Sequence, residues 1–206
     1  MKNIRPEVAL WIQTITLIVI WALLLYFSTT GFVLDWEAAR KIPEVVLLYG
    51  VLYFIFTKWL WRWSWLNGWL IPLPDLQGTW KGTLTSTWTN ATTGAPPSQV
   101  PVLFVIRQSF STISCTVHTH ESISVSVAAS FEADKNNDAK RISYVYTNTP
   151  RVPFRDRSVV HDGAAVLRVV SQTSPRLEGE YWTNRKTTGE MTLTFRDREL
   201  AEAFSD

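Results

Sequence analysis

Cysteine is almost absent from this chain of 206 residues, and Cys115 is the only one. An intramolecular disulfide is therefore excluded, and a reducing compartment fits. Charge is missing from residues 8–34, which contain no Asp, Glu, Lys or Arg. From residue 72 onward the charges cancel, with 14 Lys and Arg against 14 Asp and Glu. We therefore expect no DNA or RNA partner bound through bulk charge, whereas a small anionic ligand needs only a few local Arg or Lys.

Catalytic and metal-binding motifs are also missing. The sequence has no G-x-S-x-G elbow, Walker loop, dinucleotide fingerprint or zinc-type spacing. His118 and His120 lie two apart on one face of a predicted strand, but no third metal ligand is near. His161 and Asp162 resemble part of a catalytic pair, although Asp162-Gly163 is also a favourable turn sequence. We predict no enzyme activity, no metal and no cofactor.

Tryptophan is abundant, and eight of the eleven precede residue 70. Five of these lie in one short stretch: Trp59, Trp61, Trp63, Trp65 and Trp69. Trp rings favour the bilayer interface, where one edge is apolar and the N–H group reaches water. Lys58 and Arg62 can extend toward headgroups, and Pro72 and Pro74 disfavour continuation of a helix. The stretch predicts the point at which the chain leaves a membrane.

Two apolar segments precede this point. Residues 9–29 supply the roughly 20 apolar residues that cross the hydrocarbon. Residues 42–62 form a second predicted span, with Pro43 in its first turn. Residues 1–71 are thus predicted to be a two-helix transmembrane hairpin with a Trp-rich interface segment. Neither span carries a central charge of the kind that transporters use, so a plain anchor and a self-associating hairpin both remain open.

The orientation of this hairpin follows from the basic residues near its ends. A hairpin places the N-terminus and the following domain on one side of the membrane. That side carries Lys2, Arg5, Lys58 and Arg62, against Arg40 and Lys41 in the loop. The balance of four to two favours a cytoplasmic N-terminus and a cytoplasmic second domain.

Residues 72–206 show alternating apolar and polar side chains, which predict β-strands. Eight runs alternate in this way, at residues 76–84, 102–106, 113–117, 123–131, 142–146, 165–169, 177–181 and 191–195. Eight short strands with close turns favour a compact antiparallel β-barrel, with a two-sheet sandwich as the alternative. The fold class is thus membrane-anchored all-β. We also expect a long loop over residues 148–163 and a short helical tail over residues 198–204.

Two stretches of this domain combine the residue types that bind nucleotides. The first, residues 144–157, reads YVYTNTPRVPFRDR, and the second, residues 181–189, reads YWTNRKTTG. Aromatic rings stack on bases, amides and hydroxyls bond base edges, and Arg binds phosphate. The alternative is that the tyrosines are core residues and the charges belong to solvated loops.

The whole pattern resembles a known family. Two N-terminal spans followed by a β-barrel that opens with LQGTWKGTL and closes with LEGEYWTNRKTTGEMTL are similar to the two-transmembrane β-barrel effectors of bacterial CBASS anti-phage operons. These are the CD-NTase-associated, "SMODS-associating 2TM, β-strand rich" proteins. The central YVYTNTP motif and the HDG turn also look similar.

The resemblance implies an antiviral mechanism. A partner nucleotidyltransferase makes a cyclic dinucleotide, the barrel binds it, the protein forms homo-oligomers, and the hairpins disrupt the bacterial inner membrane, so that the cell dies by abortive infection. The residues that match the motif stretches are Tyr146, Asn148, Thr183 and Arg185, and the resemblance implies that they bind the ligand. Two alternatives remain open. Gly78-Thr79-Trp80 also opens lipocalins, which suggests a tethered barrel for an apolar ligand, and a non-enzymatic membrane adaptor is the other.

Overall fold

The computed structural model describes residues 6–27, 36–66, 71, 74–87, 99–134, 139–171 and 175–204. The chain divides into two compact units, Met1–Pro72 and Leu73–Asp206. The first part of the predicted loop between the two apolar segments, residues 30–35, lies outside the described residues, as do Trp69 and Pro72. The second part of that loop forms a short helix.

The first unit is helical. It contains α1 (Pro6–Tyr26), α2 (Trp36–Arg40) and α3 (Ile42–Lys58), followed by the 3₁₀ turns η1 (Leu60–Arg62) and η2 (Ser64–Leu66). The indole N–H of Trp21 donates to the carbonyl of Ala38, 3.1 Å away, and so joins α1 to α2. Pro43 lies in the first turn of α3, as predicted.

The helix α3 ends at Lys58, so the expectation of a helix through residue 62 is wrong. Trp59 leaves the helical conformation at φ −129° and ψ −50°, and the chain continues as 3₁₀ turns. Closely spaced indole side chains lose rotamer freedom against the preceding helical turn, which disfavours a continued α-helix here.

Both long helices expose large apolar side chains. Those on α1 include Leu10, Trp11, Ile15 and Ile18, and those on α3 include Val46, Leu47 and Phe54. Among the described residues, no helix combines the length and the hydropathy that a membrane crossing requires.

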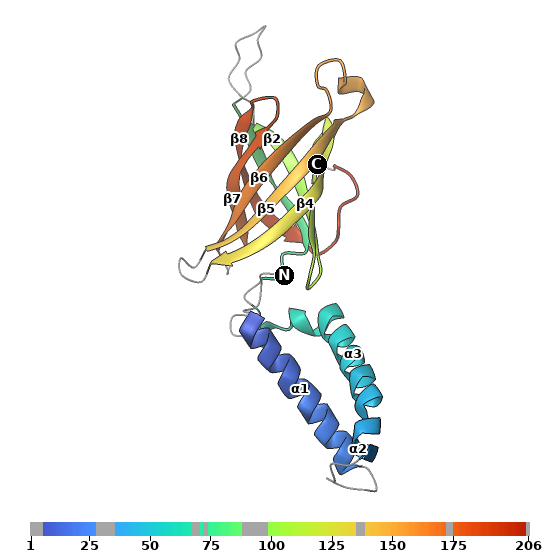
Figure 1. The fold of residues 1–206 in the computed structure, drawn as a ribbon. Coiled ribbons are helices and arrows are strands. Elements are labelled where there is room, and N and C mark those ends of the chain that lie inside the picture. The colour runs from blue at the N-terminus through green and yellow to red at the C-terminus, as the bar shows by residue number, and fades with distance from the viewer. Residues whose placement is uncertain are drawn as a thin grey trace. The chain divides into compact units, whose positions relative to one another are not determined.

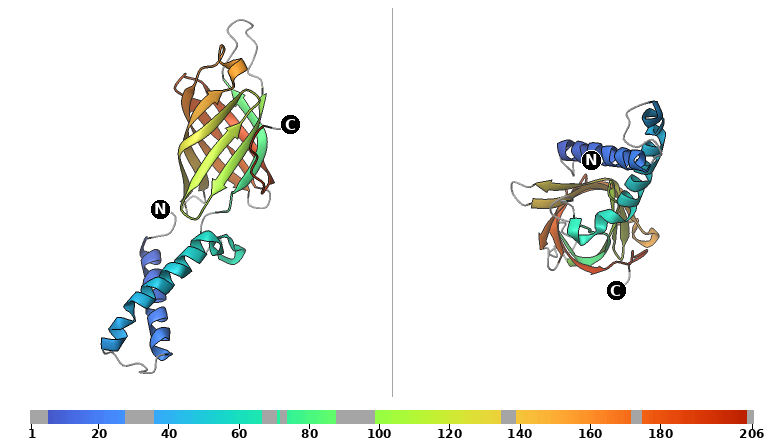
Figure 2. Two further views of the ribbon diagram at one scale, coloured as in Figure 1. Left: turned by 90° about the vertical axis from the view of Figure 1, so that its right-hand side faces the viewer. Right: turned by 90° about the horizontal axis from the view of Figure 1, so that it is seen from below.

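The second unit is a closed antiparallel barrel (Figures 1 and 2). Its strands are β1 (Gly78–Ser86), β2 (Gln99–Gln108), β3 (Ile113–His118), β4 (Ser122–Asp134), β5 (Ala139–Pro150), β6 (His161–Ser171), β7 (Arg176–Thr183) and β8 (Thr188–Asp197). Each strand pairs with the next, and β1 pairs with β8 as well as β2, which closes the sheet. The predicted eight-stranded barrel is confirmed, and the two-sheet sandwich is wrong.

The barrel interior is filled by alternating side chains from the strands. Fully buried members include Trp80, Phe104, Ile142, Leu167, Leu177 and Leu193. Gly82 lets two strands approach closely, because a Cβ atom there would lie 1.9 Å from the carbonyl oxygen of Thr192. The interior is therefore a packed core over much of its length.

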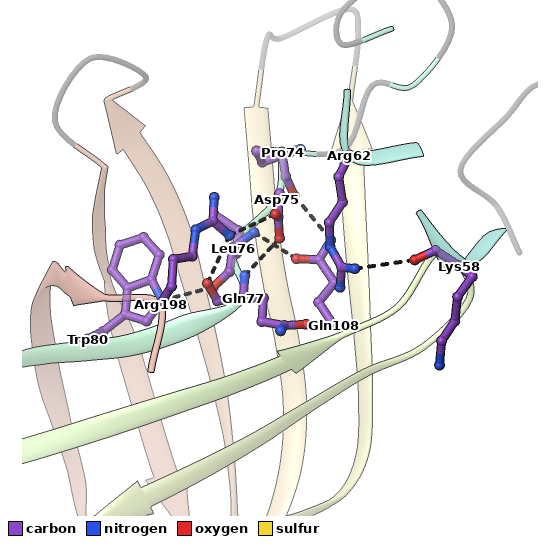
Figure 3. A network of polar contacts seen from close by, with 9 residues as sticks. All are labelled: Lys58, Arg62, Pro74, Asp75, Leu76, Gln77, Trp80, Gln108 and Arg198. Carbon is purple, nitrogen blue, oxygen red and sulfur yellow. Dashed lines mark hydrogen bonds and ion pairs between the residues drawn. The ribbon is translucent and has the colours of Figure 1, made fainter. Parts of the chain in front are cut away.

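Hydrogen bonds hold the segment that enters β1 at one end of the barrel (Figure 3). We call this end, where β1 begins and β2 finishes, the closed end. The Gln108 amide accepts from the backbone N–H of Leu76 at 2.7 Å and donates to the carbonyl of Pro74 at 3.1 Å. The indole N–H of Trp80 donates to the carbonyl of Leu76 at 3.0 Å. Arg198 pairs with Asp75 at 2.7 Å. The segment entering β1 is thus held by groups from β2 and from beyond β8.

Two loop expectations are wrong. The predicted loop over residues 148–163 is shorter, because β5 continues to Pro150 and β6 begins at His161. Asn148 pairs with His161, and Thr147 donates to Asp162 at 2.7 Å. Asp162-Gly163 is consequently part of a strand and not a turn. The connection between β5 and β6 contains one 3₁₀ turn, η3 (Val152–Phe154).

The tail over residues 198–204 is not helical. It is held against β1 by Thr79, whose hydroxyl donates to the carbonyl of Glu199 and accepts from the N–H of Ala201 at 2.9 Å. These bonds satisfy backbone groups of the tail without a helix.

Candidate ligand-binding cavity

A cavity of about 400 Å³ opens at one end of the barrel. This is the end where β1, β3, β5 and β7 finish, so it is opposite to the end that Gln108 and Trp80 close (Figure 1). All eight strands contribute lining residues, among them Leu84, Val100, Val117, Ser124, Tyr146, His161, Tyr181 and Met191. The volume lies within the range of small-molecule sites in proteins.

The floor of the cavity is aromatic. Tyr144 and Tyr146 have ring centroids 5.7 Å apart, and both line the cavity with Tyr181. Tyr146 pairs across strands with Gly163, and a Cβ atom at this glycine would lie 2.5 Å from the Tyr146 ring. Gly189 stands in the same relation to Tyr181, at 2.4 Å. The two glycines therefore make room for the two rings, as in other cross-strand aromatic–glycine pairs.

Burial raises the pKa of all three phenols and so extends the pH range over which they stay neutral. Burial raises the pKa of Tyr144 well above its usual value of 10, with Cys115 and Tyr146 adding smaller effects. Burial also raises the pKa of Tyr146 and of Tyr181, and a hydrogen bond with Ser86 partly offsets the rise at Tyr181. Each ring is thus a neutral stacking surface with a hydroxyl group.

Tyr144 differs from its two neighbours in its hydroxyl group. Its side chain is 3% exposed, and its oxygen has no hydrogen-bond partner among the described residues. A buried hydroxyl without a partner is costly. Tyr144 lines the cavity floor, and its hydroxyl group carries this cost in the ligand-free protein.

Asn148 lies above the tyrosines on β5. The Ser124 hydroxyl donates to its amide oxygen at 2.8 Å. This bond orients the amide by its oxygen, so the NH₂ group is the part that can donate to a ligand. Asn148 is buried, in keeping with an inward position near the rim.

Thr183 is the last residue of β7, and Arg185 lies in the turn that connects β7 to β8. The Thr183 hydroxyl lies 2.6 Å from that of Thr187 and accepts from the N–H of Arg185 at 3.2 Å. Lys186 takes a left-handed conformation, at φ 62°, which a residue with a side chain adopts at some cost. The turn therefore fixes the backbone at Arg185, whose guanidinium donates to Ser158 across the rim at 3.4 Å.

The cavity brings together all four residues chosen from the sequence: Tyr146, Asn148, Thr183 and Arg185 line it together. Their contact with a ligand stays a prediction. Other members of the two nucleotide-like stretches, namely Arg151, Arg155, Trp182, Asn184 and Lys186, are not among the lining residues. Trp182 lies between the inward-facing Tyr181 and Thr183 in β7. Its side chain is therefore on the outer face of the barrel, where it is about half exposed.

Sequence reasoning missed the lining residues from the first half of the barrel. These are Leu84, Ser86, Val100, Val117, Thr119, Glu121, Ser122 and Ser124. Topology could have found them, because in an up-and-down barrel the ends of odd strands and the starts of even strands meet at one rim. Arg157 and His161 also line the cavity, although neither was chosen as a ligand residue.

The histidines that the sequence offered as catalytic or metal-binding groups are separated from their expected partners. His161 and Asp162 are neighbours in β6, so their side chains point to opposite faces of the sheet. His118 ends β3, whereas His120 lies in the following turn with its ring 5.7 Å from that of Phe154, so the expectation of two histidines on one strand face is wrong. Within the described part of the chain, no three potential metal ligands form a group.

The fold and cavity define a class of protein: a small β-barrel with a packed closed end and a ligand-sized cavity at its open end, with an aromatic floor and a polar rim. The family model "Cap15, cyclic dinucleotide receptor domain" matches residues 71–195. The chain is also 25% identical over 177 residues to "CD-NTase-associated protein 15" of Escherichia albertii, covering 84% of each chain.

The chain therefore belongs to the Cap15 cyclic dinucleotide receptor family, and it is an effector of the CBASS type with a β-barrel receptor domain. This confirms the family resemblance seen in the sequence. It also decides against the lipocalin-like alternative, and the polar rim of the cavity agrees with that decision.

Proposed function

We propose that the cavity at the open end of the barrel binds a cyclic dinucleotide made by a partner nucleotidyltransferase. One observation carries this proposal: two stretches separated in sequence place Tyr146, Asn148, Thr183 and Arg185 around one cavity. The family match over residues 71–195 supports the ligand class. The protein acts as a receptor, without catalysis or a cofactor.

Each of the four residues has a distinct role in this proposal. The neutral Tyr146 ring stacks on a base. The Asn148 amide and the Thr183 hydroxyl form hydrogen bonds with base edges or ribose. The Arg185 guanidinium binds a phosphate through charge-assisted hydrogen bonds, which are shorter and stronger than neutral ones.

The helical unit carries the response in the membrane. Its support is the uncharged run over residues 8–34 and the exposed apolar side chains on α1 and α3, such as Trp11 and Leu47. Such surfaces favour lipid or other apolar helices over water. We place the protein in the bacterial inner membrane, as a multi-pass protein with its N-terminus and barrel in the cytoplasm.

Ligand binding drives homo-oligomerisation in this proposal, and the gathered hairpins disrupt the bilayer. A single hairpin without central charges supplies no polar pathway, so several copies must act together. Linking many weak helix contacts through an assembled receptor makes their association strong. The outcome is death of the infected cell and antiviral defence by abortive infection.

Binding is tested by calorimetry on the full-length protein in detergent. The probes are cyclic dinucleotides carrying each pairing of the four RNA bases. We expect one or a few members to bind, and we expect Arg185→Ala and Asn148→Ala to weaken that binding without loss of the fold. Absence of binding to every member by folded protein would contradict the receptor function and favour a membrane adaptor.

The membrane response is tested in liposomes that contain the full-length protein and a trapped dye. We expect dye release only when the bound cyclic dinucleotide is added, together with a larger species in sedimentation. Arg185→Ala should release dye only at higher ligand concentration. Full release without ligand would contradict ligand control of the hairpin.

A further inference from the structure

The rim of the cavity carries a second arginine, Arg157, which ends the first nucleotide-like stretch but is not among the four residues chosen from the sequence. Arg157 lies in the connection between β5 and β6 and lines the cavity together with Arg185. Arg157 and Arg185 are the only Lys or Arg residues among the described residues that line the cavity. Arg185 donates to Ser158, the residue next to Arg157, so the Arg185 guanidinium lies close to the segment that carries Arg157.

Arg157 is held in place by contacts with two different segments. Its guanidinium carbon lies 4.8 Å from the centre of the Phe154 ring. It also donates to the carboxylate of Glu121, which lies in the turn between β3 and β4 and lines the same cavity. The backbone N–H of Arg151 donates to the carbonyl of Glu121 at 2.8 Å, which ties the two segments together.

The pairing of Arg157 is exposed on both sides. The side chains of Arg157 and Glu121 are 62% and 49% exposed. An ion pair in such a setting is weak, because water screens it. A phosphate oxygen can therefore replace the carboxylate at little cost, and the Phe154 ring keeps the guanidinium in position during the exchange.

A cyclic dinucleotide has two phosphodiester groups, each with one negative charge. Arg185 matches one of them. We propose that Arg157 binds the second phosphate, and that Glu121 is an internal competitor that holds the Arg157 guanidinium until the ligand replaces it. This inference rests on the proposed function, because it assigns a further residue to the same site. Glu121 lowers the affinity by its charge, and its ion pair with Arg157 links the β3–β4 turn to the β5–β6 connection while no ligand is bound.

The test measures the affinity of full-length variants in detergent for the cyclic dinucleotide that the wild-type protein binds most tightly. We expect Arg157→Ala to weaken binding by about 10- to 100-fold, the value of a charge-assisted hydrogen bond. Arg157→Lys keeps the charge but loses the planar fork, so it should lie between wild type and alanine. Glu121→Gln keeps a carbonyl oxygen for Arg157 and removes the competing charge, so it should tighten binding by roughly 2- to 5-fold.

The chain offers a matched control at the other end of the barrel. Arg141 and Glu132 form an ion pair at 3.3 Å with side chains 48% and 53% exposed. Arg141→Ala and Glu132→Gln change the net charge by the same amounts and should leave the affinity unchanged. The slope of the affinity against salt concentration should become smaller in Arg157→Ala and stay unchanged in the two control variants, because only Arg157→Ala loses a charged contact with the ligand.

The outcomes separate the inference from the proposed function. If wild type binds and Arg185→Ala weakens binding, but Arg157→Ala and Arg157→Lys bind as wild type, the second phosphate site is wrong. Weaker binding by Glu121→Gln overturns the exchange, since Glu121 would then only position Arg157. Equal changes in the Arg141 and Glu132 controls also overturn the inference, because bulk charge would explain the effect. If wild type binds no member, the proposed function fails and the inference with it.

Discussion

The two ends of the barrel use the same strands for different purposes. At the closed end, buried polar groups have partners: the Trp80 N–H bonds to Leu76, and the Gln108 amide bonds to Pro74 and Leu76. At the open end, a buried phenol at Tyr144 has no partner among the described residues. The closed end therefore supplies stability, and the open end keeps binding capacity for a ligand.

The side chains that face the barrel interior change from apolar to polar between the closed end and the open end. Large apolar groups such as Phe104 and Leu193 are fully buried in the packed part. Toward the open end, Ser124, Asn148 and Thr183 take the equivalent inward positions. Stability and function are thus separated along one axis, and mutations at the two ends should differ in kind as well as in size.

The largest effect is expected at the closed end, from Trp80→Ala. This side chain is 1% exposed, and its ring packs edge-on against Phe195 with centroids 5.3 Å apart. Loss of a buried aromatic side chain costs about 3–5 kcal/mol. Denaturant unfolding of the full-length protein in detergent measures this loss. Asn148→Ala at the open end is the comparison, and an equal loss there would contradict the division between the ends.

Gly163→Ala is expected to lower stability less than Trp80→Ala does, and to weaken ligand binding as well. The new Cβ atom would lie 2.5 Å from the Tyr146 ring and 2.7 Å from the carbonyl oxygen of Trp182, so both the ring and the backbone of β7 must shift. We expect a loss of about 1–3 kcal/mol in stability from overpacking, together with weaker ligand binding. Calorimetry and denaturant unfolding measure the two effects.

Gly50→Ala is the matched control for this substitution, because no atom beyond the adjacent helix backbone lies within 4 Å of the position that a Cβ atom would take there. It should leave ligand affinity unchanged. Wild-type affinity in Gly163→Ala would show that the position of Tyr146 does not shape the binding site.

The third prediction concerns the hydroxyl of Tyr144. Tyr144→Phe removes a buried oxygen without a partner, so the ligand-free protein should gain up to about 1 kcal/mol of stability or stay unchanged. Ligand affinity should fall by roughly 5- to 10-fold if this oxygen bonds to the ligand. The melting temperature with and without a cyclic dinucleotide measures both effects.

Trp80→Phe provides the opposite case at the closed end, since it removes an N–H group that has a partner in Leu76. It should lower stability and leave affinity unchanged. A stability loss in Tyr144→Phe would mean that its hydroxyl already has a partner in the protein.

The contrast between the ends also explains how far sequence reasoning reached. Alternation found all eight strands, because inward positions in the packed part are apolar, as in the run Val102, Phe104 and Ile106. At the cavity the predicted strands were too short. β5 reaches Pro150 where the pattern stopped at residue 146, and β8 begins at Thr188 where the pattern began at residue 191. There the inward residue, Asn148, is polar, so alternation fades where the cavity begins.

Other misses depend on contacts that are distant in sequence. The tail over residues 198–204 is fixed by Thr79, 120 or more positions earlier, and no local pattern reveals such a bond. Tyr146, Asn148, Thr183 and Arg185 could be chosen because each lies in a motif-like stretch. Glu121 and Ser124 lie in an unremarkable stretch and become cavity residues only through closure of the barrel.

The smallest expected effect is a pH dependence at the open end, from His118. Its side chain is buried at the end of β3, and its Nδ1 atom has no hydrogen-bond partner among the described residues. Burial lowers the pKa of His118 below 6.5, and the charges of Arg107 and Arg151 lower it further. The unfolded chain therefore takes up a proton first as the pH falls below about 6.5, so stability is complete above this pH and decreases toward the folded pKa. The slope is at most about 1.4 kcal/mol per pH unit.

Denaturant unfolding between pH 7.5 and 5 should show this decrease in wild type and a flatter profile in His118→Gln. The matched control is His120→Gln, which removes an exposed imidazole. An unchanged slope in His118→Gln would assign the acid sensitivity to groups elsewhere in the molecule.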